Sequence, residues 1–273
     1  MSVDFIKVFR ASLRYPLRKD AYLIFFVIQI ILGIAGWLVS GYLGGDIVGP
    51  DGTLMMENML PFMVYLLPLA IAGWVVMVFL LPAYMDNSAH FCKGKRKAIL
   101  ESFEVSRKRF LPTLAVFVIL GLILLACFGG FILLVASVPI IFSPTGMMLT
   151  AVGTVWTIAG LIIGIIVAFT TFLSPVFCVL EKQKPLDSIK KSWKLVKKNK
   201  ASTLIFFVIF FAVYLGIAIA GALPEIIFAF FYDTPAALSP AGFSLMVVRT
   251  AVNAYLMLFV LASLVSYYFG IKK

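Results

Sequence analysis

Residues 201–224 read ASTLIFFVIFFAVYLGIAIAGALP and contain no charged side chain. A helix of this length can cross a bilayer core about 30 Å thick, because each helical residue adds about 1.5 Å. Five further stretches meet the same demand, at residues 21–43, 61–85, 111–136, 147–177 and 243–270. The sequence therefore predicts an all-α, polytopic integral membrane protein with six transmembrane helices.

The composition supports this fold class and argues against a water-soluble globule. The chain of 273 residues is 63% hydrophobic and only 13% charged, whereas soluble domains have about half and a quarter. A bilayer tolerates so much apolar surface, because lipid solvates apolar side chains and helices satisfy their own backbone hydrogen bonds. No early apolar run with a small-residue cleavage site is seen at the N-terminus, so we expect the first span to remain as an anchor.

The basic residues predict the orientation of the spans. All but one of the 23 Lys and Arg residues fall on one side of the predicted membrane, in segments 1–20, 86–110 and 178–200 and at the C-terminus. Basic loops resist translocation, which predicts a cell-membrane protein with both termini in the cytoplasm. The net charge of +11 thus belongs to loops that flank the membrane, and a nucleic-acid partner is not expected.

A threefold repeat underlies the six spans. Phe9, Phe103 and Trp193 each follow an apolar residue by four positions and precede a basic residue by five. Each of these segments comes just before an odd-numbered span. The pattern predicts one transmembrane domain built from three repeats, each a short amphipathic interfacial helix and a transmembrane hairpin, at about residues 1–85, 95–177 and 186–273.

The three short segments are candidates for binding lipid. In the third, Leu186, Ile189, Trp193 and Val196 fall at the spacing of one helical face. Helices with an apolar face and a basic face lie in the headgroup plane and attract anionic lipid. The candidate interface residues are Lys190, Lys191, Trp193, Lys194, Lys197, Lys198, Arg107, Lys108, Arg10 and Arg14. Simple anchoring of the hairpins is the alternative explanation.

Residues 174–199 read SPVFCVLEKQKPLDSIKKSWKLVKKN. A span that contains Pro near its end, then an acidic residue, then a basic helix with Ser-Trp resembles a six-span superfamily. That superfamily includes the membrane domain of glycerophosphoryl diester phosphodiesterases. The resemblance implies architecture only, because the chemistry of those enzymes belongs to a separate soluble barrel. No catalytic residue is therefore carried over.

One polar cluster could bind a metal. Asp86, His90 and Cys92 offer three ligand types that suit zinc. A fourth ligand is not evident, and the polarity of a loop beside the membrane accounts for the same residues. We therefore predict neither a metal site, a cofactor nor a catalytic residue, and expect that the protein is not an enzyme.

Arg249 is the one candidate for a charge within a span. It lies about six residues into the sixth span, or roughly 9 Å deep. Because a charge inside the membrane is costly, Glu225 or Asp233 in the preceding loop is the predicted partner. An Arg249 side chain that extends to the interface is the alternative.

Small residues in the spans indicate where helices pack closely. Gly160 and Gly164 form a GxxxG pair, and Ala212, Gly216 and Ala220 repeat the same spacing. The middles of the other spans hold essentially no ionisable residue, which argues against an ion-coupled transporter.

Taken with the basic segments, these features predict a non-enzymatic scaffold, accessory subunit or lipid-organising factor. Its expected partners are anionic headgroups of the cytoplasmic leaflet, with or without another membrane protein. The alternative is a permease for a neutral or lipid-like substrate.

Overall fold

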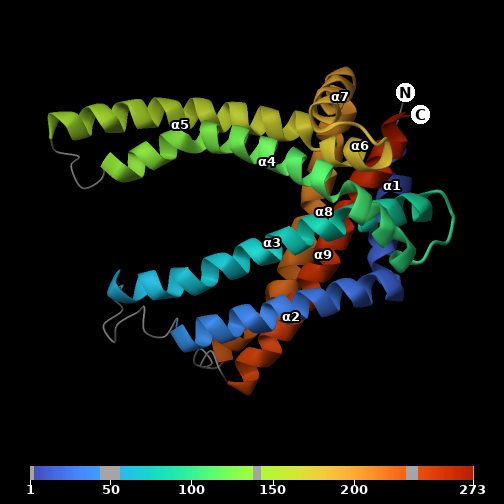
Figure 1. The fold of residues 1–273 in the computed structure, drawn as a ribbon, viewed down its shortest axis with the longest axis horizontal. Coiled ribbons are helices and arrows are strands. Elements are labelled where there is room, and N and C mark those ends of the chain that lie inside the picture. Colours follow the sequence, from blue (N-terminus) through green and yellow to red (C-terminus); the bar gives the residue numbers. More distant parts are fainter. Residues whose placement is uncertain (1–2, 44–55, 138–142, 232–238, 273) are drawn as a thin grey trace. The chain divides into compact units, whose positions relative to one another are not determined.

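The structure, a computed structural model, describes residues 3–43, 56–137, 143–231 and 239–272 (Figure 1). All regular structure within these ranges is helical. The helices are α1 (Phe5–Arg14), the short 3-10 helix η1 (Tyr15–Leu17), α2 (Lys19–Leu43), α3 (Met56–Cys92), α4 (Ile99–Ser137), α5 (Pro144–Thr171), α6 (Ser174–Leu180), α7 (Pro185–Lys198), α8 (Lys200–Phe231) and α9 (Pro240–Lys272).

Six segments of these helices are long and apolar enough to cross a membrane. They are Lys19–Val39, Met63–Cys92, Ile99–Phe131, Met147–Leu180, Lys200–Pro224 and Ala241–Lys272. The fourth combines α5 with α6, which accounts for the unusual length of the predicted fourth span. The prediction of an all-α, multi-pass membrane protein with six spans is confirmed.

The chain forms two compact units. The first comprises Met1–Arg107 and Leu204–Lys273, and the second comprises Lys108–Thr203. In the first unit α9 is central, because it packs against α1, α2 and α3 (Figure 1). The buried aromatic rings of Phe206 and Tyr267 stack there with their centroids 4.2 Å apart.

Helix α1 is held firmly against α9. Asp4 caps its start by accepting a hydrogen bond from the Lys7 backbone N–H at 3.0 Å, and Val8 and Phe9 are buried on its inner side. At its other end the Tyr255 hydroxyl donates to the Leu13 carbonyl at 3.0 Å. The helix is thus a packed part of the first unit.

The second predicted interfacial segment differs from the other two. It is the first part of the continuous helix α4 and not a helix of its own. Pro16 lies in η1, directly after α1. Helix α7 ends at Lys198, because the next residue, Asn199, has a non-helical backbone conformation. Between Ile99 and the span there is no such break until Pro112, which α4 accommodates in its interior. Because no helix-breaking residue separates them, the interfacial segment and the span form the single helix α4.

In the second unit α4 and α5 approach each other closely through glycine. A Cβ atom at Gly160 would lie 1.7 Å from the Cys127 carbonyl oxygen, and one at Gly130 would lie 2.5 Å from the Thr157 backbone nitrogen. The predicted close approach at Gly160 is confirmed. The parallel prediction for Gly216 is wrong, because a Cβ there would meet no described atom within 4 Å.

Replacing Gly160 with Ala should therefore destabilise the protein. The added methyl group overlaps backbone that cannot move aside, and overpacking of this kind typically costs about 1–3 kcal/mol. We expect the melting temperature in mild detergent to fall by several degrees. Gly216→Ala is the matched control and should melt at or above the parental temperature, since Ala favours a helix over Gly by about 1 kcal/mol. Equal melting temperatures for Gly160→Ala and the parent would contradict the close approach.

Candidate functional site

The outer surface of α7 carries a cluster of free lysines. Its inner side consists of Ser188, Ser192 and Val196, which are buried, and the Ser192 hydroxyl donates to the Thr170 carbonyl at 2.8 Å. These small side chains let α7 pack closely against α5 and α6. The residues on its outer surface that we call the α7 lysine face are exposed, namely Lys190, Lys194, Lys197 and Lys198.

Two large apolar side chains border the α7 lysine face. Leu186 is 59% exposed and Trp193 is 41% exposed. The predicted apolar face is therefore divided, because Val196 points into the protein while these two do not. Small serines take the places nearest the neighbouring helices. In a bilayer, exposed Leu186 and Trp193 are free to contact lipid.

Lys191, another predicted interface residue, is also exposed but has an ion-pair partner. Its ammonium group forms an ion pair with Glu181 and lies 5.7 Å from the centroid of the Phe177 ring. The Glu181 side chain is only 14% exposed. Lys191 thus fastens α7 to the end of α6 and holds the α7 lysine face in place.

The remaining candidate interface residues lie on other helices. Arg10 and Arg14 are exposed on α1, and Arg107 is exposed on α4 in the same unit. Lys108 is also exposed, but it belongs to the second unit and has an interaction partner. Among the helices that the structure describes, α7 carries the largest group of exposed lysines without a described partner, which is the α7 lysine face.

The three short segments bury equivalent positions. Counted from the recurring aromatic residue, the position before it is buried in each, at Val8, Ser102 and Ser192. The position three residues after it is buried as well, at Ser12, Ser106 and Val196. The threefold repeat remains a prediction, and this shared pattern is what it would produce.

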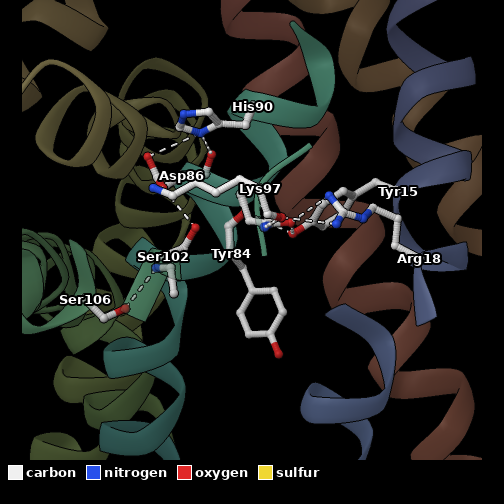
Figure 2. A network of polar contacts seen from close by, with 10 residues as sticks. Tyr15, Arg18, Tyr84, Asp86, His90, Lys97, Ser102 and Ser106 are labelled. Carbon is white, nitrogen blue, oxygen red and sulfur yellow. Dashed lines mark hydrogen bonds and ion pairs between the residues drawn. The ribbon is translucent and has the colours of Figure 1, made fainter. Parts of the chain in front are cut away.

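A polar network occupies the end of α3 in the first unit (Figure 2). The Lys97 ammonium group lies 2.6 Å from one carboxylate oxygen of Asp86, and the Ser102 hydroxyl donates to the same oxygen at 2.9 Å. His90 Nδ1 lies 2.8 Å from the Asp86 backbone carbonyl oxygen. The Asp86 side chain is 15% exposed and that of Lys97 is 21% exposed, so the pair is mostly removed from water.

The network continues to the turn that precedes α2. The Tyr15 hydroxyl donates to Asn87 Oδ1 at 3.1 Å, and Arg18 donates to the Lys97 carbonyl at 3.2 Å. Burial, followed by the nearby Tyr84 phenol, raises the pKa of Tyr15 well above its usual value. These contacts join three separate chain segments, which is a structural role.

The suspected metal ligands do not converge. Cys92 shares a hydrogen bond with the Ser266 hydroxyl at 3.1 Å, while Asp86 is occupied by Lys97 and Ser102. Among the described residues, no three His, Cys, Asp or Glu side chains are grouped so that they could hold a metal ion.

Arg249 lies on α9 and is exposed. It forms no ion pair or hydrogen bond with the residues that the structure describes. Its predicted partners fall outside those residues, Glu225 by its side chain and Asp233 entirely. The predicted charge pair therefore stays a prediction.

Comparison with known families places the chain among proteins whose role is open. The model of a domain of unknown function, DUF7847, matches residues 4–271. The chain belongs to this family. No curated protein and no solved structure shows significant similarity to it. The match carries no link to the glycerophosphoryl diester phosphodiesterase membrane domain, so that resemblance also stays a prediction.

Sequence reasoning about the DUF7847 chain missed most of the network in Figure 2. The sequence marks Asp86 and His90 as possible ligand types, but it does not show that Lys97 and Ser102 contact the Asp86 carboxylate. Nor does it show that Asn87 accepts a hydrogen bond from Tyr15. One signal could have revealed the site. Asn87 and Ser88 stand beside Asp86 at the end of an apolar span, where polar groups need partners.

Breaking the Asp86–Lys97 pair should destabilise the DUF7847 chain. Lys97→Met leaves a mostly buried carboxylate without its cation, which should cost on the order of 2 kcal/mol. Thermal melting in detergent should report a loss of several degrees. The double variant Asp86→Asn, Lys97→Met should recover part of it, because no charge is then left unpaired.

Lys95→Met is the control for this experiment, since Lys95 is exposed in the same connection. It should melt at the parental temperature. If Lys97→Met melted there too, the pair would have no structural role.

Proposed function

We propose that this DUF7847 chain is a non-enzymatic integral membrane protein that organises anionic lipid at the cytoplasmic leaflet. The α7 lysine face is its working surface. The observation that carries the proposal is the arrangement of α7, in which four exposed lysines lie beside exposed Leu186 and Trp193 while the opposite side is packed on α5 and α6. A role as scaffold or accessory subunit would use the same surface.

The physical chemistry of the interface supports this proposal. Trp prefers the boundary between headgroups and hydrocarbon, so Trp193 would place α7 at headgroup depth. Each Lys near an anionic leaflet contributes about 1 kcal/mol. Because the Lys191–Glu181 pair and the buried Ser192 already hold α7 in position, little ordering is needed when lipid binds.

The proposed orientation follows from the distribution of basic residues. The segments that precede α2, α4 and α8 are rich in Lys and Arg, and the opposite loops are not. This asymmetry favours a cytoplasmic location for α1, α7 and both termini in the cell membrane.

The orientation can be tested by thiol labelling of intact cells. Cys92, Cys127 and Cys178 are first replaced by Ser, and single cysteines are then introduced at Asp51, Ser239, Lys95 or Lys190. An impermeant maleimide should label the first two from outside and should label the last two only after permeabilisation. The reverse pattern would place α7 outside the cell and would rule out a cytoplasmic lipid surface.

Lipid selectivity can be measured in proteoliposomes with the full chain. Trp193 becomes the only energy donor when Phe replaces the other three tryptophans, Trp37, Trp74 and Trp156. Transfer to a dansyl-labelled phosphatidylglycerol should exceed transfer to the same label on a zwitterionic lipid several-fold. The excess should shrink with added salt, because the Debye length falls from about 10 Å at 0.1 M to about 3 Å at 1 M.

Two matched variants show whether the preference for anionic lipid depends on the α7 lysine face or only on the total charge of the protein. Gln at the four positions of the α7 lysine face should remove the anionic preference. Gln at four exposed basic residues in the connections before α4 and α7 should leave most of it, namely at Lys95, Arg96, Lys182 and Lys184. Equal losses in both variants would reduce the effect to net charge and overturn the proposed surface.

A further inference from the structure

An open cavity, with a volume of about 390 Å³, lies at the surface among α2, α3 and α9 in the first unit. Its size is within the range of small-molecule sites, which is about 300–1,000 Å³. Four polar side chains and five apolar or small residues line it: Gln29, Arg249, Thr250 and Asn253, with Leu32, Gly33, Gly73, Met77 and Met246. None of these nine residues is acidic.

The polar side chains of the cavity are mostly free to bind a ligand. Arg249 and Asn253 stand four residues apart on α9, and both are exposed. Neither has a hydrogen bond to the described part of the chain. The Gln29 amide nitrogen donates only to the Met77 sulfur, at 2.8 Å, and a thioether is a weak acceptor. The cavity therefore presents a guanidinium group and two amides.

The depth of the cavity makes these free groups costly. Gln29 is the central residue of the candidate span Lys19–Val39, about 15 Å from either end. Arg249 lies about 12 Å along the candidate span Ala241–Lys272. Bilayer lipid tails offer such groups no hydrogen bonds, and a charge inside the membrane usually marks a functional site. An anion with several oxygen atoms would satisfy all three side chains.

The apolar part of the cavity indicates what is attached to the anion. Leu32, Met77 and Met246 supply aliphatic and thioether surface, and methionine adapts to irregular partners. Gly33 lets α2 approach α9 closely beside this surface, since a Cβ there would lie only 3.2 Å from the Thr250 hydroxyl. A polar group at one point and flexible apolar surface beside it suit an amphiphile better than a free inorganic ion.

We propose that this cavity binds an amphiphile whose headgroup is a carboxylate or a phosphate. Arg249 contacts two headgroup oxygens, and the amides of Gln29 and Asn253 donate to the same headgroup. The alkyl chain lies along Leu32, Met77 and Met246. This site is separate from the α7 lysine face, because it is in the other unit and within the spans.

Equilibrium binding to the purified full chain tests the proposal. The probes share one alkyl chain and differ in headgroup: radiolabelled oleate, oleyl phosphate and oleyl alcohol. At least one anionic probe should bind saturably, at one site per chain, about tenfold more tightly than the alcohol. The stronger of oleate and oleyl phosphate identifies the headgroup. Equal affinity for all three probes would overturn the proposal.

Variants show whether Arg249 supplies the selectivity. Arg249→Gln should weaken binding of the anionic probe about tenfold and leave binding of oleyl alcohol unchanged, whereas Lys95→Gln, at an exposed residue of the same unit, should change neither. Asn253→Ala provides an independent test should Arg249→Gln fail to fold, and should also weaken the anionic probe. Unchanged anion binding in Arg249→Gln, as expected if Glu225 or Asp233 already neutralises Arg249, would overturn the site.

The α7 lysine face provides the remaining control. Gln at Lys190, Lys194, Lys197 and Lys198 should leave oleate binding at the cavity intact. A negative result for the cavity site can thereby be told apart from a negative result for the α7 lysine face. Loss of oleate binding in this variant alone would assign the anion to the surface and overturn the cavity site.

Discussion

The inability of lipid tails to form hydrogen bonds governs this structure. Within a bilayer, every backbone group must find its partner inside its own segment, which leaves the helix as the solution for this chain. The same constraint sorts the side chains, because polar groups are stable only where they find one another. Asp86, Lys97, Asn87 and Tyr15 do so at one end of α3. That network joins the turn before α2 to the connection before α4.

The same need of polar groups for partners explains why the short helices α1 and α7 are packed against neighbouring helices. Helix α1 lies on α9, and α7 lies on α5 and α6, so neither floats freely at the surface. The buried side of α7 is made of small or modest residues such as Ser192, whereas α1 buries the large Phe9 together with Ser12. A narrow buried side leaves most of the circumference of α7 exposed. A helix held in this way presents its lysines at fixed positions, which a mobile segment could not do.

The six spans could be predicted from sequence because apolar length alone decides them. The packing side of α7 could not. An apolar residue beside a membrane is equally stable against lipid or protein, so the spacing of Leu186 and Trp193 did not show which they face. The same ambiguity affects glycine: Gly160 meets a neighbouring backbone and Gly216 meets nothing described, although both stand in small-residue patterns. The Asp86 network was hidden because Lys97 and Ser102 lie in other chain segments.

The α7 lysines and Arg249 differ in their surroundings, because the lysines lie at the surface and Arg249 lies within a span. The α7 lysines stand where water and salt screen them, so each contributes little and only their number and spacing give selectivity. Arg249 stands inside a span, where the surroundings screen weakly and one guanidinium can dominate a site. In the two proposals taken together, the protein binds anionic amphiphiles in two ways, by their collective charge at the leaflet and by a single headgroup within the helices. Salt should therefore weaken the first interaction far more than the second, because only the first lies in water.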